Sequence, residues 1–138
     1  MGVIFDTSVL IEAERGRFDV DAFVRGREEE PFGLSVVTVA ELLHGVHRAD
    51  TQSRRLKRAA YVEKVIADFP IITFDVSVAR IYASMWAALM AQGTTIGAHD
   101  LIIGSTALAH GFSVATFNVR HFERIEGLNM EILIPQTR

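Results

Sequence analysis

Short apolar runs alternate along this chain with longer stretches whose apolar residues recur every three or four positions. This alternation is typical of βαβ units, in which helices cover a sheet of parallel strands. The chain has no internal repeat and no linker rich in Pro, Gly or Ser. We therefore expect residues 1–138 to form a single domain with an α/β fold, a three-layer α/β/α sandwich around a central parallel sheet of about five strands.

The same pattern gives approximate boundaries for the elements. We expect strands at about 2–6, 33–37, 70–74, 113–117 and 131–134, and helices at about 8–14, 19–27, 38–48, 52–68, 76–92 and 99–110, with a short turn near 119–124. Gly93 and Gly111 are expected to end the last two long helices. The pair Thr7-Ser8, and Thr38, are expected to cap the helices that follow the first two strands. The aromatic side chains expected in the core are Trp86, Phe112 and Phe117.

Composition narrows the chemistry that is open to the chain. It contains no cysteine, so any metal site must use oxygen or imidazole ligands. No basic leader begins the chain, and no apolar run approaches the roughly 18 residues of a membrane span, so we expect a soluble cytoplasmic protein. A formal net charge of −3 provides no general attraction to nucleic acid. This charge is still compatible with a metal-dependent nuclease, because the metal ion supplies positive charge at the phosphate.

Three carboxylates stand where an expected strand ends or an expected helix begins. Asp6 closes the first strand, Glu41 lies just beyond the second, and Asp100 opens the helix at 99–110. Because the carboxyl ends of parallel strands share one edge of a sheet, we expect these acids to converge. Like charges held together need a cation or a shifted pKa to offset their repulsion. Carboxylate oxygens suit Mg²⁺ or Mn²⁺, and such a site indicates phosphodiester hydrolysis.

Each acid also has a simpler interpretation when it is taken alone. Asp6 is in a position to serve as a helix N-cap or a turn residue. Glu41 follows Thr38 by three positions, the spacing of a capping box, and Asp100 fits a first-turn acid favoured by the helix dipole. Asn118 stands after the fourth expected strand, where a fourth acid could have been.

Four ordered segments of the chain resemble the motifs of one known family. They are Val3–Ile11, Ser35–Leu42, His99–Ala107 and Val114–Phe122, and Ile125–Leu128 resembles the family's usual approach to its last strand. With these motifs the chain looks like a PIN-domain ribonuclease, specifically a VapC-type toxin of a type II toxin–antitoxin system. The resemblance runs nearly from end to end, and four motifs in order are far more specific than one.

This resemblance implies an endoribonuclease that depends on Mg²⁺ or Mn²⁺, with Asp6, Glu41 and Asp100 as catalytic and metal-binding residues. Asn118 corresponds to a fourth catalytic position, where many relatives carry Asp and some carry Asn. Its neutral carboxamide implies one strong metal position rather than two. The implied partners are an RNA substrate, a small VapB-like antitoxin and a second copy of the chain.

Hydroxyl and guanidinium groups near these motifs are candidates for substrate binding. Ser8, with its neighbour Thr7, and Thr116 are in a position to offer hydroxyl groups to the site, although helix capping explains them equally well. Arg54 and Arg58 share one helix face in the densest basic cluster of the chain. That face either steers RNA phosphates or is an ordinary solvated surface.

Other functional classes have less support in the sequence. A receiver-like signalling domain needs a lysine after the fifth strand, but the only lysines are Lys57 and Lys64. The five histidines show no zinc-binding spacing. A metal-binding PIN module without catalytic activity stays an alternative, against which the three intact acids argue. The homodimer is favoured by an apparent surplus of apolar residues in the helices at 38–48 and 52–68: Leu42, Leu43, Val46, Leu56, Tyr61, Val62, Val65 and Ile66.

Overall fold

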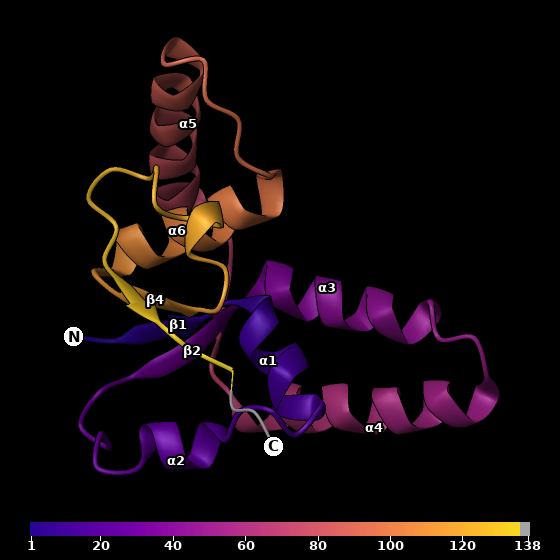
Figure 1. Ribbon diagram of the computed structural model, residues 1–138. Coiled ribbons are helices and arrows are strands. Elements are labelled where there is room, and N and C mark those ends of the chain that lie inside the picture. The colour runs from indigo at the N-terminus through magenta and orange to yellow at the C-terminus, as the bar shows by residue number, and fades with distance from the viewer. Residues whose placement is uncertain (136–138) are drawn as a thin grey trace.

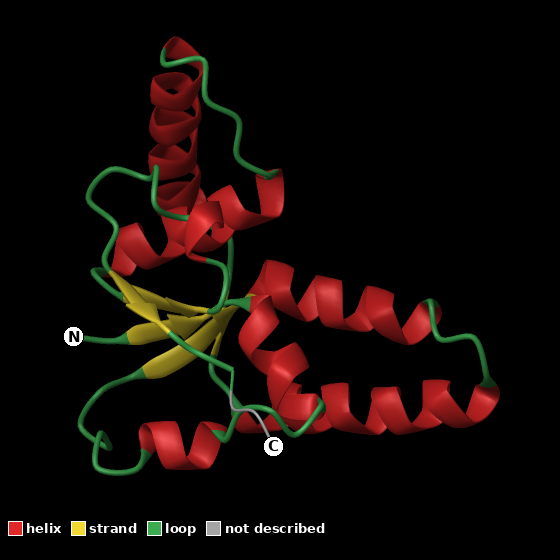
Figure 2. Cartoon of the chain, viewed as in Figure 1, coloured by secondary structure: helices red, strands yellow, loops and turns green. Residues whose placement is uncertain are grey.

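The computed structural model of the chain describes residues 1–135 and contains a five-stranded sheet with helices on both faces (Figure 2). The elements in chain order are β1 (Val3–Phe5), α1 (Thr7–Glu14), α2 (Val20–Val24), β2 (Phe32–Ser35), α3 (Val36–His47), α4 (Gln52–Asp68), β3 (Ile71–Ile72), α5 (Val76–Ala91), α6 (Ala98–His110), β4 (Ser113–Thr116), the 3₁₀ helix η1 (Val119–His121) and β5 (Met130–Ile132). The predicted three-layer α/β/α architecture is confirmed.

All strand pairs are parallel, and the strand order is β3-β2-β1-β4-β5. β1 therefore lies at the centre, where Val3 pairs with Phe32 of β2 on one side and with Ser113 of β4 on the other. The chain crosses from β3, at one edge of the sheet, to β4 in the opposite half through α5 and α6. In open α/β sheets, ligands bind outside the carboxyl ends of the strands at such a change of direction.

Alternating side chains of the central strands form two cores, one on each face of the sheet. Phe5 and Ala115 pack with side chains of α1, α3 and α4. Ile4 and Val114 point the other way and pack with side chains of α5 and α6. Figure 1 shows α5 and α6 on one side of the sheet and the first four helices on the other. The alternation of two residues per repeat in a strand produces this division.

Both helices that follow the central strands begin earlier than the sequence predicted. Thr7 is the first residue of α1, and Asp6 occupies its N-cap position without a capping hydrogen bond from its side chain. Ser35 caps α3 and accepts a hydrogen bond of 3.2 Å from the Val37 amide, whereas Thr38 lies inside the helix and is fully buried. The predicted capping roles of Thr7-Ser8 and Thr38 are therefore wrong. The chain turns into each helix at or directly after the end of the strand, so the N-cap position falls on Asp6 and on Ser35, ahead of the threonines.

Other helix ends match the prediction. Gly93 and Gly111 follow α5 and α6 with φ angles of 69° and 66°, a left-handed conformation that glycine adopts without strain. α3 and α4 form a long antiparallel hairpin that projects beyond the sheet (Figure 1). Trp86 on α5 is 53% exposed and so does not belong to the core, while Phe112 and Phe117 pack against it as expected. Within residues 1–135, no helix is both long and apolar enough to span a membrane.

Candidate active site

The end of β1 presents a buried carboxylate. Asp6 is only 3% exposed, and its backbone N–H donates to the Ala115 carbonyl at 3.0 Å. Its Oδ2 accepts hydrogen bonds from Ser8 Oγ at 2.8 Å and from Thr116 Oγ1 at 2.9 Å. Burial raises the pKa of Asp6 above its usual range, although the hydrogen bonds from Ser8 and Thr116 act in the opposite direction and the charge of Glu41 adds to the rise. The carboxylate is thus fixed in position by neighbours from β4 and α1.

Glu41 lies in the second turn of α3 and reaches back toward α1. Thr7 Oγ1 donates to Glu41 Oε1 at 2.7 Å and shares a hydrogen bond of 2.9 Å with Thr38 Oγ1. The other oxygen, Oε2, lies 3.5 Å from Nδ1 of His99. Because Thr38 is inside the helix, the capping-box interpretation of Glu41 is wrong. Instead, Thr38 and Thr7 link Glu41 to the first turn of α1.

Asp100 is in the first turn of α6, and its Oδ2 lies 3.1 Å from Nδ1 of His121. Burial raises the pKa of Asp100; the neighbouring His121 opposes this rise, and the charges of Asp6 and Glu41 reinforce it. The charges of Asp6 and Glu41 act on Asp100, so the three acids lie in one region at the carboxyl edge of the sheet. Their closer convergence around a metal ion stays a prediction.

Three other predicted site residues, Ser8, Thr116 and Asn118, lie close to Asp6. Thr116 is fully buried and donates to Asp6, so it positions a carboxylate and does not contact substrate. Ser8, which is half-buried, also donates to Asp6. Asn118 is exposed next to them, and its backbone N–H donates to Thr116 Oγ1 at 2.8 Å. The backbone of Asn118 therefore lies next to the residue that holds Asp6.

The two arginines predicted to contact substrate have different surroundings. Arg54 is at the far end of the α3–α4 hairpin, where both oxygens of Asp50 accept from its Nη1 at 2.8 and 2.9 Å. Arg58, one turn further along α4, donates from Nη1 to the Gly45 carbonyl at 2.9 Å and lines a groove that also contains Glu41. The structure therefore brings Arg58 toward the acids but leaves Arg54 paired at the hairpin end.

Two histidines that contact the acids were not assigned a role from the sequence. His99 pairs with Glu41 and not with its neighbour Asp100, and His121 reaches Asp100 from η1. The sequence does indicate that His99 lies near the acids, because it is the neighbour of Asp100. It does not indicate the contact of His121, because that contact depends on how the chain turns after β4.

The chemistry of this donor set fits a hard divalent cation. In the described part of the chain no lysine or arginine pairs with Asp6, Glu41 or Asp100, so their combined negative charge has only imidazole neighbours. Such a set of carboxylate oxygens suits Mg²⁺ or Mn²⁺. Across residues 1–135, however, no three acidic or imidazole side chains already converge closely enough to hold a metal ion. Glu41 and Asp100 are the less buried of the three acids and have room to adjust.

Comparison with known proteins places this site in a wider context. The family model described as PIN domain matches residues 3–128. Ribonuclease VapC1 of Rickettsia felis is 38% identical over 133 residues, which cover 94% of this chain and 95% of that protein. The tRNA(fMet)-specific endonuclease VapC of Salmonella typhimurium is 33% identical over 98 residues, covering 71% and 72% of the two chains. The crystal structure of DNA-bound VapBC from Salmonella typhimurium matches with a TM-score of 0.84 at 26% identity, covering 96% of this chain and 98% of that one. The region that matches the family model contains all three acids and Asn118.

Proposed function

This chain belongs to the PIN-domain family, among its VapC-type ribonucleases, and we propose that it is the endoribonuclease toxin of a toxin–antitoxin pair. It would hydrolyse RNA phosphodiester bonds at the cluster formed by Asp6, Glu41 and Asp100. The observation that carries this proposal is the buried Asp6, fixed by Ser8 and Thr116 beside two further acids that have no arginine or lysine partner among residues 1–135. Membership of the family also overturns the receiver-like alternative.

We propose Mg²⁺ or Mn²⁺ as the cofactor and Asp6, Glu41 and Asp100 as its ligands. A bound ion would supply a positive charge for the scissile phosphate and lower the pKa of a water molecule that attacks it. The chain's own contribution is positional: Ser8 and Thr116 orient Asp6, and Thr7 orients Glu41. The half-buried edge of the sheet limits access of bulk water, which strengthens these electrostatic interactions.

Incubation of the purified protein with total cellular RNA tests this function. Cleavage is expected with Mg²⁺ or Mn²⁺ and is expected to stop when EDTA is added. If RNA remains intact at every metal concentration, the chain is instead a PIN module that binds without cleaving.

Asn118 provides a prediction about the metal. Asn118→Asp adds one negative charge beside the acids at nearly constant shape, so it is expected to lower the Mg²⁺ or Mn²⁺ concentration for half-maximal cleavage by about threefold or more. In the metal-free protein the added like charge is expected to lower the melting temperature, and saturating metal is expected to restore it. Metal titrations of cleavage and of thermal unfolding measure both effects. Identical titrations for the two proteins would show that position 118 does not face the ion.

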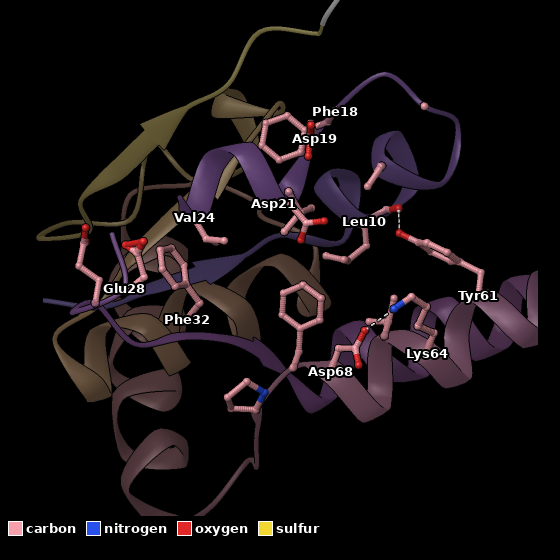
Figure 3. A pocket seen from close by; sticks show the side chains of 17 residues that line it. Leu10, Phe18, Asp19, Asp21, Val24, Glu28, Phe32, Tyr61, Lys64 and Asp68 are labelled. Atoms are coloured by element: carbon pink, nitrogen blue, oxygen red, sulfur yellow. Dashed lines mark hydrogen bonds and ion pairs between the residues drawn. The ribbon is translucent and has the colours of Figure 1, made fainter. Parts of the chain in front are cut away.

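A larger groove fits the proposed antitoxin partner. It has a volume of about 840 Å³ and lies between α1, α2, β2 and α4 (Figure 3). Apolar and aromatic side chains form its floor: Leu10, Phe18, Val24, Phe32 and Val65. Carboxylates surround them: Asp19, Asp21, Glu28, Glu30 and Asp68. Lys64, on the same surface, is paired with Asp68 at 2.7 Å. An apolar helix that carries basic side chains complements this surface, which is the chemistry we propose for a VapB-like antitoxin.

Charge reversal at this groove tests the partner assignment. The double variant Asp21→Lys and Glu28→Lys is expected to weaken binding of the cognate VapB-like antitoxin by about tenfold or more, because it places like charges against basic side chains. RNA cleavage by the free protein is expected to be unchanged. The double variant Glu63→Lys and Glu126→Lys, at two exposed positions outside the groove, changes the net charge by the same amount and is the control. Equal antitoxin affinity in wild type and double variant, measured by calorimetry, would place the contact elsewhere.

We also propose a homodimer, but through a different surface from the one suggested by the sequence. The sequence left the apolar residues of α3 and α4 as candidates for the core or for an interface, and four of them belong to the core: Leu42, Val46, Val62 and Val65. Exposed apolar side chains lie instead along one face of α5, with Val76 67%, Trp86 53% and Met90 68% exposed. Ala79 and Ala83 lie between them on the same face, where their small side chains permit close approach of a second helix.

The double variant Trp86→Glu and Met90→Glu is expected to convert the dimer to a monomer of 15.3 kDa in sedimentation velocity. Leu56→Glu, at a 64% exposed position on α4, is expected to leave the dimer intact. A wild-type protein that sediments only as a monomer at micromolar concentration would overturn this assembly.

A further inference from the structure

A second groove leads away from the acids between α1, α3 and α4. It has a volume of about 320 Å³, and Glu41 forms part of its wall. Three arginines from three different segments line it: Arg15 after α1, Arg48 after α3 and Arg58 on α4. The groove is therefore continuous with the carboxylate site and lined by guanidinium groups that are far apart in the sequence.

The three guanidinium groups differ in how they are held. Arg58 donates to the Gly45 carbonyl at 2.9 Å, which fixes it against α3. Arg15 is 58% exposed and makes a loose ion pair of 3.6 Å with Glu12. The Arg48 side chain has no hydrogen bond or ion pair with another side chain within residues 1–135, and it is exposed. Opposing these three positive charges in the lining are Glu14 and Glu41, and Glu41 belongs to the carboxylate site.

Gly45 gives an independent reason to regard this groove as a binding surface. It lies inside α3, where glycine is less favourable than alanine. A Cβ atom at this position would meet no heavy atom within 4 Å, so packing does not require a glycine. The residue lines the groove, and its missing side chain leaves the helix backbone open to close approach by a ligand.

We propose that this groove binds the phosphates of the RNA strand on one side of the bond that is cleaved, with Arg15, Arg48 and Arg58 as the contacts. This inference rests on the proposed ribonuclease function and deepens it by giving the substrate a path from the acids along the α3–α4 hairpin. Guanidinium groups pair with phosphate oxygens through two parallel hydrogen bonds, and arginine suits this role better than lysine. Contacts to phosphate position a strand without reading its sequence.

Salt dependence of RNA binding tests the groove directly. Binding of a labelled single-stranded RNA is measured by fluorescence anisotropy in EDTA, which prevents metal-dependent cleavage. Each of the substitutions Arg15→Ala, Arg48→Ala and Arg58→Ala is expected to make the slope of log K against log salt less steep by about 0.7, the value for one phosphate contact on a single strand. Arg25→Ala, which removes the same charge from an exposed position that lines neither groove, is expected to keep the wild-type slope.

Kinetics with metal separate binding from catalysis. Arg48→Ala is expected to raise KM about threefold to tenfold while kcat stays the same, because a flanking contact is made equally in the ground state and the transition state. Gly45→Gln, which fills the groove, is expected to raise KM in the same way. Gly45→Ala is expected to raise KM by less than Gly45→Gln, because one methyl group occupies less of the groove, and its melting temperature is expected to rise.

The results separate a failure of the groove assignment from a failure of the proposed ribonuclease function. If wild type cleaves RNA but all three arginine variants keep its slope and KM, the groove assignment is wrong while the proposed function stands. If those variants lose affinity for the antitoxin with no change in RNA binding, the groove belongs to the protein partner and the assignment is again wrong. A wild type that neither binds nor cleaves RNA would overturn the groove and the ribonuclease function together.

Discussion

RNA cleavage is expected to fall by at least about a thousandfold when any one of Asp6, Glu41 and Asp100 is replaced by its amide. Each substitution removes a negative charge from the set of oxygens that we propose to hold the metal, while the shape of the side chain is kept. The measurement is the rate of cleavage of a labelled RNA at saturating Mg²⁺ or Mn²⁺. Glu63→Gln, an exposed position on α4, is the matched control and is expected to retain full activity.

The raised pKa of Asp100 also predicts that the stability of the folded protein changes with pH. Burial raises the pKa of Asp100 above its ordinary value of 3.8. The folded protein then holds this proton more tightly than the unfolded chain, so stability is expected to fall as pH rises from 3.8 through the raised folded pKa. Asp100→Asn removes the part of this fall that comes from Asp100, while Asp6, whose pKa burial also raises, keeps its own part. Above this range the melting temperature of Asp100→Asn in metal-free buffer is expected to equal or exceed that of wild type.

Two results would contradict this account of the acids. Near-native cleavage by any one variant would remove that residue from the ligand set. A clear loss of melting temperature in Asp100→Asn at neutral pH would show that the carboxylate stabilises the fold, for example through His121, more than it strains it.

Phe5→Ala is expected to lower the free energy of unfolding by about 3–5 kcal/mol, the cost typical of removing a buried phenyl group. The Phe5 side chain is fully buried at the centre of the sheet, and its ring lies 5.5 Å from that of Phe23, 5.7 Å from Phe32 and 5.8 Å from Phe69. The substitution would therefore leave a cavity at the position directly before Asp6. Urea unfolding followed by circular dichroism measures the loss.

A substitution of this size can leave little folded protein, so Phe5→Leu provides a second measurement. It retains most of the buried volume and is expected to lose less than half as much stability. Phe74→Ala is the surface control, because that ring is 42% exposed. A similar loss for Phe5→Ala and Phe74→Ala would show that the packing around β1 is not what stabilises the sheet.

The sequence predicted the architecture well because its signals are local. Alternation of apolar runs with helical spacing is written into each segment, and Gly93 and Gly111 end helices through a backbone preference of their own. The starts of α1 and α3 were harder to predict. The N-caps fall on Asp6 and Ser35, at the very ends of the strands. Thr7 and Thr38, which have typical capping side chains, instead hold Glu41 through Thr7.

The positions of the acids could be predicted from the sequence, but those of the groove arginines could not. Asp6 directly follows β1 and Asp100 is in the first turn of α6, so the parallel topology indicates that both lie at the carboxyl edge of the sheet. Glu41 is in the second turn of α3 and is held there by Thr7. The groove arginines have no such signal: Arg15 and Arg48 come from two separate turns, and only the packing of α1 against the hairpin makes them neighbours. Long-range side-chain contacts of this kind depend on the folded geometry, which no local pattern contains.

The central position of β1 has a consequence for the order in which activity can arise during synthesis. Asp6 is made well before Thr116 of β4, which holds it. A nascent chain that has not yet delivered α6 and β4 lacks Asp100 and leaves one edge of β1 unpaired. The site can therefore assemble only after β4 has left the ribosome, so activity cannot arise while that part of the chain is still being made.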